Sequence, residues 1–251
     1  MIAALLLGRA GSVGFPGKNL SKIMGRSLME YPLLAALNSS EVDEVYVSTD
    51  SPEIGETARK HGAFVIDRPA HLCTKEALSD DAYAHGYNYI KDMGKSIELL
   101  VLLFCNAPCF LPEHIAEGVK VLRENPSYDS AVTVSCYNMY APPRARRINE
   151  EGLLCPFIPF ENYPKDITIN CDRDAQGDAW FADVCLTIVR PRCLDDISNG
   201  VLPQKWMGRR IYPIKQWGGL DVDYEWQVPI VEFWLEAHGF TNKKLPYTTR
   251  K

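Results

Sequence analysis

The chain opens with Met1-Ile-Ala-Ala-Leu-Leu-Leu-Gly-Arg-Ala-Gly-Ser-Val-Gly-Phe-Pro-Gly-Lys-Asn19, the stretch that decides its fold. Residues 2–7 form a continuous apolar run, which is typical of a central strand buried on both faces of a parallel sheet. The loop that follows is rich in glycine and also carries two cations. Glycines let backbone N–H groups approach a phosphate closely, and cations neutralise its charge. The stretch therefore predicts a nucleotide-binding loop directly after the first strand.

Composition narrows the class of protein. The chain has 251 residues, of which 46% are hydrophobic and 24% charged, and its net charge is −5. These values are ordinary for a globular enzyme and give no indication of a nucleic-acid partner. The first apolar run is too short for a membrane span and lacks the charged start of a secretory signal. We therefore expect a cytoplasmic protein without a membrane partner.

The cysteines and histidines indicate neither disulfides nor zinc. The eight cysteines are spread along the chain without a C-x-x-C pair, and the five histidines form no H-x-x-x-H pattern. Spread cysteines in apolar surroundings are typical of reduced core residues in a cytosolic protein. A zinc site is not expected.

Strand and helix patterns alternate along most of the chain, which predicts a mainly parallel sheet with right-handed crossovers. The expected strands are 2–7, 44–49, 63–66, 99–104, 130–134, 180–189 and 211–213, and the expected helices are 27–38, 51–61, 225–238 and two that begin at 79 and 112. We expect a single domain, 1–251, with the α/β fold of a three-layer α/β/α sandwich. The segment 138–178 is rich in Pro, Arg, Asn and Asp, and we expect it to leave the sheet as an excursion.

Two common phosphate-binding patterns do not fit the first loop. A Walker A loop requires G-x-x-x-x-G-K-[ST], whereas Ser12 stands at the first glycine position and Asn19 replaces the final hydroxyl residue. The dinucleotide pattern G-x-G-x-x-G differs in spacing from Gly8, Gly11 and Gly14. A plain glycine-rich turn is a further alternative, but it would leave the two cations without a purpose.

The order Arg-x-Gly-Ser-x-Gly-x-Pro-x-Lys-Asn over residues 9–19 resembles the signature of the acylneuraminate cytidylyltransferase family, which activates sugar acids as CMP conjugates. The resemblance implies a Rossmann-like sheet of the nucleotide-diphospho-sugar transferase type, and a homodimer joined through the excursion. It also implies that loop residues hold the triphosphate of CTP, namely Gly8, Arg9, Gly11, Ser12, Lys18 and Asn19. Arg9 and Lys18 would act on the departing pyrophosphate.

Gly218-Gly-Leu-Asp221-Val-Asp223 resembles the D-[IV]-D motif of the same family. Alternation places both carboxylates on one face of an extended segment, where they can bind Mg²⁺ on a triphosphate. A role for Asp223 as the N-cap of the last helix is the competing interpretation. The phosphate loop in the same chain favours the metal, and Asp223 is then also a catalytic candidate.

Other candidates are implied by the resemblance alone. Arg68 stands where the family has an arginine near the cytidine or its phosphates, and Asn106 offers an amide to the nucleotide or substrate. Asp50 is interpreted as an ordinary acid at a strand end. The segment 103–110 departs from the family, because Phe104 and Phe110 replace the expected Gln and Arg.

The excursion and the strand after it carry the candidate acceptor-binding residues. These are Arg173, Gln176 and Asp183. A guanidinium such as that of Arg173 matches the two oxygens of a carboxylate. The cluster Arg144–Arg147 is equally well interpreted as a solvated edge or a subunit interface.

The sequence therefore predicts a transferase that couples CMP from CTP to an acidic small-molecule acceptor, with Mg²⁺ as cofactor. A nonulosonic or other sugar acid is the first choice, and a phosphonate or other non-sialic acid is an alternative. A glycosyltransferase is a further rival, and a non-catalytic nucleotide-binding regulatory protein is the alternative from another class.

Overall fold

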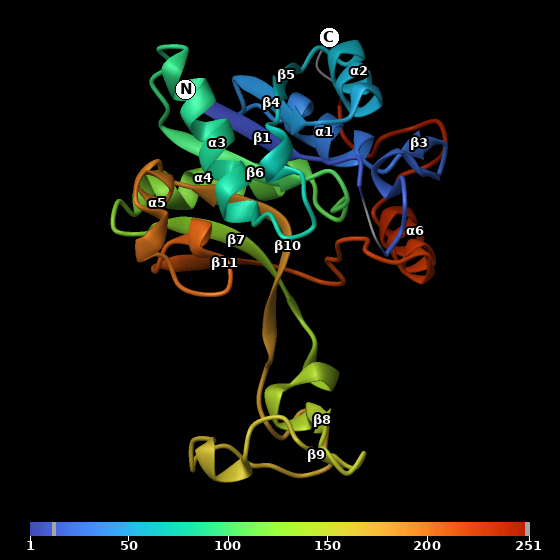
Figure 1. Ribbon diagram of the computed structural model, residues 1–251, viewed down its shortest axis with the longest axis vertical. Coiled ribbons are helices and arrows are strands. Elements are labelled where there is room, and N and C mark those ends of the chain that lie inside the picture. The colour runs from blue at the N-terminus through green and yellow to red at the C-terminus, as the bar shows by residue number, and fades with distance from the viewer. Residues whose placement is uncertain (12–13, 249–251) are drawn as a thin grey trace.

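The computed structural model describes residues 1–11 and 14–248, and a seven-stranded sheet lies at its centre (Figure 1). The strand order is β11-β7-β10-β6-β1-β4-β5. The strands are β1 (Ile2–Leu7), β4 (Glu44–Thr49), β5 (Phe64–Asp67), β6 (Leu99–Phe104), β7 (Ser130–Cys136), β10 (Trp180–Val189) and β11 (Ile211–Gln216). Every neighbouring pair is parallel except those of β10, which runs antiparallel to β6 and to β7. The prediction of a mainly parallel sheet is confirmed.

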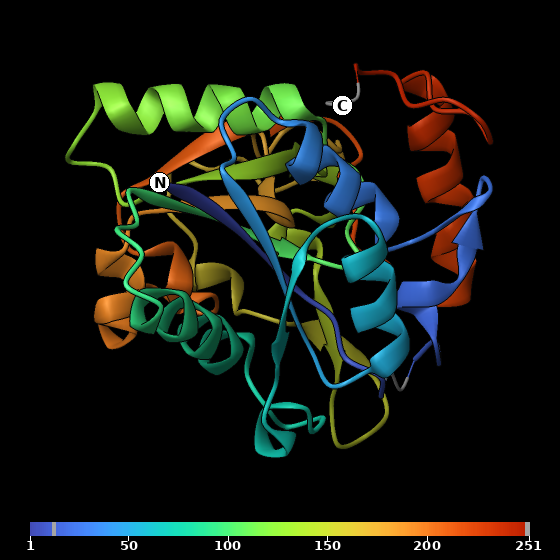
Figure 2. The same ribbon diagram turned by 90° about the horizontal axis from the view of Figure 1, so that it is seen from above.

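Helices cover both faces of the sheet (Figure 2). They are α1 (Glu30–Asn38), α2 (Pro52–Lys60), α3 (Ser79–Asp92), α4 (Pro112–Glu124), α5 (Arg192–Asp195) and α6 (Val228–Ala237). Alternate residues of β1 enter two different cores. Ala4 and Leu6 pack with α1, α2, α4 and α6, whereas Ala3 and Leu5 pack with α3 and α5. This is the predicted α/β/α sandwich.

Short elements complete the fold. Two small hairpins join β2 (Lys22–Ile23) to β3 (Arg26–Ser27) and β8 (Arg146–Ile148) to β9 (Leu154–Pro156). The 3₁₀ turns are η1 (Lys18–Leu20), η2 (Ala70–Leu72), η3 (Asn138–Tyr140), η4 (Pro142–Arg144), η5 (Phe160–Asn162), η6 (Ile197–Asn199), η7 (Lys205–Met207) and η8 (Glu225–Gln227).

Local chemistry explains where helices begin. The Ser51 side chain caps α2 by accepting a hydrogen bond from the backbone N–H of Ile54 at 3.3 Å, as its position before a proline predicts. The helix expected from residue 27 begins only at Glu30. Ser27 belongs to a hairpin strand, and its N–H and hydroxyl both donate to the Glu30 carboxylate, at 2.6 and 2.8 Å. The expected boundary was therefore wrong by three residues.

The segment 138–178 leaves the sheet between β7 and β10 and projects well away from it (Figure 1). Its apolar side chains are largely exposed; Ile148, Leu154 and Phe157 are examples. The expected role of this extension in dimerisation stays a prediction.

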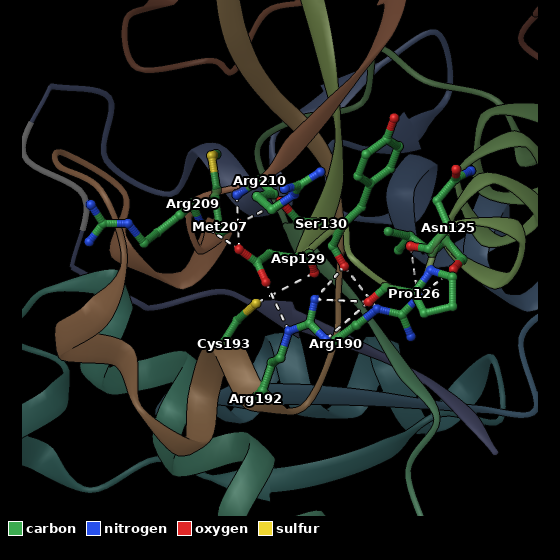
Figure 3. Close-up of polar contacts among 12 residues, drawn as sticks. Asn125, Pro126, Asp129, Ser130, Arg190, Arg192, Cys193, Met207, Arg209 and Arg210 are labelled. Carbon is green, nitrogen blue, oxygen red and sulfur yellow. Dashed lines mark hydrogen bonds and ion pairs between the residues drawn. The ribbon is translucent and has the colours of Figure 1, made fainter.

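The amino end of β7 is held by a dense polar network, which we call the Asp129 cluster (Figure 3). The Asp129 carboxylate accepts from the backbone N–H groups of Arg209 and Arg210, both at 2.9 Å, and from Arg192 Nε at 2.8 Å. Arg190 Nε donates to the Tyr128 carbonyl at 2.8 Å. The cluster joins the starts of β7 and β11 to the end of β10. It therefore lies at the amino ends of the parallel strands, opposite to their carboxyl ends.

Two further properties concern the whole described chain. None of its helices, within residues 1–11 and 14–248, is both long and apolar enough to cross a membrane. All eight cysteines are free.

Candidate active site

A pocket with a volume of about 500 Å³ opens at the carboxyl ends of the parallel strands. This edge is where open α/β sheets bind ligands. The pocket brings together most of the predicted site residues: Gly8, Arg9, Lys18, Asn19, Arg68, Asn106, Asp221 and Asp223. Gly11 is not among its lining residues, and Ser12 lies outside the described residues.

Two segments far apart in the sequence meet in this pocket. Lys18 Nζ lies 2.6 Å from Asp223 Oδ1, in an ion pair that spans 205 residues of sequence. The Lys18 side chain is 14% exposed, and that of Asp223 is 56% exposed. Gly14 allows the approach, since a Cβ atom there would lie 2.7 Å from the Asp223 carbonyl oxygen. The contact brings the predicted phosphate loop and the acidic pair together, and their roles toward phosphate and metal stay predictions.

Asp221 is held beside Asn106. Asn106 Nδ2 donates to the Val222 carbonyl at 3.0 Å and approaches Asp221 Oδ2 at 3.5 Å. Burial raises the pKa of Asp221, and the nearby charge of Asp223 raises it further. A cation bound beside Asp221 would offset both effects and stabilise its ionised form.

The competing role of Asp223 as a helix cap is not observed. The N-cap residue of η8 is Tyr224, and that of α6 is Gln227. The Asp223 backbone N–H donates to the Gln227 side chain at 2.6 Å, while its carboxylate points to Lys18.

The two aspartates fit a divalent cation that a substrate helps to bind. Carboxylate oxygens are the ligands that Mg²⁺ prefers, and Mg²⁺ usually combines one or two of them with substrate phosphates. Within the described residues, no group of three or more His, Cys, Asp or Glu side chains is arranged to hold a metal. The protein alone therefore supplies an incomplete set of ligands, which a triphosphate can complete.

Arg9 is anchored at the entrance of the phosphate loop. Its Nη1 donates to the carbonyls of Cys73, at 3.2 Å, and of Thr74. Asn19 Nδ2 donates to the Arg9 carbonyl at 3.2 Å. Asp50 Oδ1 accepts from the Ala10 N–H at 2.9 Å, so this acid supports the loop, in keeping with its structural interpretation. These contacts hold the guanidinium in place through neutral carbonyl groups, and its positive charge remains available to a ligand.

Arg68 is the most buried cation of the pocket, with 8% of its surface exposed. Its Nε donates to the Ser48 hydroxyl at 3.0 Å, and its Nη2 donates to the Ser48 carbonyl. Burial lowers its pKa, and the nearby Asp50 carboxylate acts in the opposite direction. Because both groups of Ser48 are neutral, this buried charge also favours an anionic or strongly polar ligand.

The three predicted acceptor-binding residues do not line the pocket. Arg173 pairs with Asp174 at 2.8 Å in the extension, and Gln176 Nε2 donates to backbone carbonyls there, including that of Asn170 at 3.3 Å. Asp183 is buried between strands, where it accepts from the Ser135 hydroxyl at 2.8 Å. Their positions in this chain give them structural contacts and do not support contact with an acceptor in the same pocket.

The sequence missed part of the pocket wall. Val184, Gln204, Trp206 and Tyr224 line it together with Phe104. Phe110, the second departure from the family motif, is instead buried in the core with 1% of its surface exposed. Trp206 lies in the 3₁₀ turn η7, which no sequence pattern predicts. Its position in the pocket wall therefore follows only from the fold.

Comparison with known proteins gives a consistent result. The cytidylyltransferase family model matches residues 3–145. The N-acylneuraminate cytidylyltransferase of Escherichia coli O18:K1:H7 is 32% identical over 137 residues, which cover 55% of this chain and 32% of that protein. The CMP-N,N'-diacetyllegionaminic acid synthase of Legionella pneumophila is 30% identical over 174 residues, covering 69% and 72% of the two chains.

Length and structure refine the comparison. The matched stretch spans only 30% of N-acylneuraminate cytidylyltransferase A of Danio rerio, about a third of such longer relatives. A solved CMP:2-keto-3-deoxy-manno-octonic acid synthetase complexed with CTP superposes with a TM-score of 0.67 at 16% identity, over 94% of this chain and 98% of that one. A 4-diphosphocytidyl-2C-methyl-D-erythritol synthase gives 0.62 at 13% identity, over 93% and 99%. At such identities the solved structures show the shared fold alone. The family match and the curated relatives show that the chain belongs to the cytidylyltransferase family.

Proposed function

We propose that this protein transfers CMP from CTP to a hydroxyl of an acidic acceptor, a sugar acid, and releases pyrophosphate. The contact between Lys18 and Asp223 carries the proposal, because a cation suited to phosphate and a carboxylate suited to Mg²⁺ lie side by side in one pocket. The printed names of the relatives support the choice of cytidine and of sugar acids.

The proposed role of each pocket residue follows from its position. Arg9 and Lys18 bind the triphosphate and stabilise the charge that develops on the departing pyrophosphate. Arg68 binds the nucleoside side of CTP, and Asn106 holds the Asp221 carboxylate in place. The reaction needs positioning and charge stabilisation and no covalent intermediate.

Asp221 and Asp223 would hold Mg²⁺ together with phosphate oxygens. The bound ion would supply charge neutralisation at the α- and β-phosphates. Binding of the triphosphate would also change the partner of the Asp223 carboxylate. When the triphosphate draws the Lys18 ammonium away, the carboxylate loses its counter-charge and becomes free for the cation.

The alternatives are less well supported. The D-x-D pattern of a glycosyltransferase is expected in mid-chain, whereas the mid-chain instance at residues 172–174 lies in the extension, outside the pocket. A phosphonate acceptor has no observation of its own in its favour. A homodimer and a cytoplasmic location complete the proposal, and the exposed apolar extension and the free cysteines are consistent with them.

A pyrophosphate-release screen tests the proposal. Each of the four nucleoside triphosphates is combined with a panel of 2-keto-3-deoxy sugar acids and phosphonates, with Mg²⁺ present. We expect release with CTP and a sugar acid only. Tight CTP binding in calorimetry without release for any acceptor would instead support the regulatory protein.

A further inference from the structure

Asp183 is a buried carboxylate that accepts four hydrogen bonds. Only 6% of its surface is exposed. Its Oδ1 atom accepts from the Thr133 hydroxyl at 2.5 Å and from the Cys185 N–H at 3.2 Å. Its Oδ2 atom accepts from the Ser135 hydroxyl and from the Gln216 side-chain amide, both at 2.8 Å. Hydrogen bonds of this kind stabilise the charged form of a buried acid, so the fold itself stabilises this carboxylate.

The bulge in β10 is fixed by the same network. The pairing of β10 with β7 shifts register here, and Val184 has a φ angle of 53°. A β-branched residue in the left-handed region is a true outlier, and such strain persists only where the surrounding structure holds it. Thr133 holds it from β7, because its hydroxyl donates to Asp183 and accepts from the Leu186 N–H at 3.1 Å. The bulge and the carboxylate therefore form one unit.

The other oxygen of Asp183 connects this unit to the segment that leads to the acidic pair. The Ser135 hydroxyl, which donates to Asp183, also accepts from the Gly219 N–H at 2.9 Å. The Gly219 carbonyl accepts from the Tyr137 hydroxyl, also at 2.9 Å. A Cβ atom at residue 219 would lie 2.0 Å from Asp183 Oδ2, so the contact requires glycine. Gly219 is thus held directly against the buried carboxylate.

The backbone is held on both sides of Asp221. Gly219 lies two residues before it. Directly after it, the Val222 N–H donates to the Asn106 carbonyl at 2.8 Å, and the Val222 carbonyl accepts from Asn106 Nδ2 at 3.0 Å. Asp223 follows at once. Carboxylates on a backbone fixed at two points have few positions available to them, as a precise metal site requires.

We infer that Asp183 and Ser135 are positioning residues, which fix the backbone of Gly219 and thereby the two carboxylates proposed to bind Mg²⁺. Partners that orient metal ligands from outside the coordination sphere commonly affect metal affinity. Neither residue lines the pocket, so both act through the backbone. This inference rests on the proposed function and adds the residues that orient its metal site.

Two variants form a matched pair for the test. Ser135→Ala and Thr133→Val each remove one hydroxyl that donates to Asp183. The first leaves the Gly219 N–H without its acceptor, and the second does the same to the Leu186 N–H. Both should therefore lower the free energy of unfolding, measured in urea, by similar amounts.

Calorimetric titration of CTP with and without Mg²⁺ separates the pair. The gain in CTP affinity that Mg²⁺ gives should be about fivefold smaller in Ser135→Ala than in the unmodified protein, the equivalent of one hydrogen bond. In Thr133→Val the gain should stay within about twofold of that in the unmodified protein, because this hydroxyl does not contact Gly219.

Substitution of Asp183 separates positioning from direct metal binding. In Asp183→Asn the amide can accept at Oδ1 and donate to the Ser135 oxygen, so the gain from Mg²⁺ should stay within about twofold of that in the unmodified protein. Asp183→Ala removes both functions and should lose the gain as Ser135→Ala does. Equal losses in Asp183→Asn and Asp183→Ala would make the charge itself essential and overturn the inference.

Two further outcomes contradict the inference in different ways. An unchanged gain in Ser135→Ala, or equal losses in Ser135→Ala and Thr133→Val, would leave the network a structural role alone and overturn the inference while the proposed function stands. No gain from Mg²⁺ in the unmodified protein would contradict the proposed metal site, and the inference with it.

Discussion

Carboxylates lie at both ends of the parallel strands, and the two ends differ in how the protein stabilises the negative charge. In the Asp129 cluster at the amino ends, the carboxylate accepts three hydrogen bonds from its own fold (Figure 3). In the pocket at the carboxyl ends, Asp221 lies near a second carboxylate, and the half-exposed Asp223 forms an ion pair with Lys18. The first arrangement is complete without a ligand, whereas the second is not.

The pKa values of the two partly buried acids, Asp129 and Asp221, differ in the same way. Burial pushes the pKa of Asp129 upward, but the backbone N–H groups of Arg210 and Arg209 and the Arg192 guanidinium outweigh it and hold the pKa below its ordinary value. Burial raises the pKa of Asp221, and the Asp223 charge adds to it. The fold therefore stabilises the charge of Asp129, whereas the charge of Asp221 is destabilised, which favours the cation proposed for this site.

The largest expected effect is on turnover. Asp223→Asn removes a charge at the proposed metal site, and we expect kcat to fall by about 10³-fold, comparable with the loss of a principal electrostatic group. The free energy of unfolding should change by less than about 1 kcal/mol, since the Asp223 side chain is 56% exposed. The control is Glu225→Gln, which changes an exposed acid outside the pocket lining. Near-normal pyrophosphate release by Asp223→Asn would remove this carboxylate from the mechanism.

Asp129→Ala should do the reverse, lowering stability without changing CTP binding. It leaves the N–H groups of Arg209 and Arg210 unpaired, and we expect the free energy of unfolding to fall by about 2–4 kcal/mol. Because the pKa of Asp129 is lowered by folding, its stabilisation is present above the ordinary Asp range and is lost as the pH falls through the lowered value. Urea unfolding at neutral and acidic pH measures both effects. An unchanged midpoint at neutral pH would contradict the assigned role.

Lys18→Ala should have opposite effects on the binding of nucleotide and of metal, because Lys18 is proposed to bind phosphate and is paired with Asp223. CTP affinity should fall about 10- to 100-fold, the range for a charged hydrogen bond to phosphate. Binding of Mn²⁺ to the ligand-free protein should become tighter, because Asp223 loses its counter-charge. Calorimetry and Mn²⁺ paramagnetic resonance measure these effects, with Lys22→Ala as the exposed control. Parallel weakening of nucleotide and metal would contradict the partner exchange.

The smallest effect concerns Asp221 and stability. Since its pKa is raised in the folded state, the stability of the ligand-free protein should decrease as the pH rises from the ordinary Asp range through the raised value. Asp221→Asn should abolish this dependence and slightly raise the free energy of unfolding at pH 7, as urea unfolding would measure. A destabilised Asp221→Asn would show that the carboxylate is held by the fold, as in the Asp129 cluster.

The sequence predicted the pocket better than its surroundings. Apolar runs defined β1, β4 and β6, and glycines with two cations marked the loop, because phosphate binding restricts a short contiguous stretch. The Asp pair was identified from its resemblance to the family's D-[IV]-D motif. The antiparallel direction of β10 and the Asp129 cluster depend on pairing between distant segments, which no local pattern carries.

The acceptor side was predicted least well. Arg173, Gln176 and Asp183 were chosen by resemblance, and in this chain they contact the extension or the sheet. Trp206 and Val184 line the pocket because of a 3₁₀ turn and a bulge. Such irregular elements are set by tertiary packing, so composition and periodicity do not announce them.

The most direct test of the shared site is calorimetric titration of CTP with and without Mg²⁺, in the unmodified protein and in the Asp221→Asn, Asp223→Asn double variant. The account predicts that Mg²⁺ tightens CTP binding by about tenfold or more in the unmodified protein and has no such effect in the double variant. Equal tightening in both proteins would show that the carboxylates do not bind the metal at the triphosphate. It would contradict the claim that the phosphate loop and the Asp221–Asp223 pair act in one site.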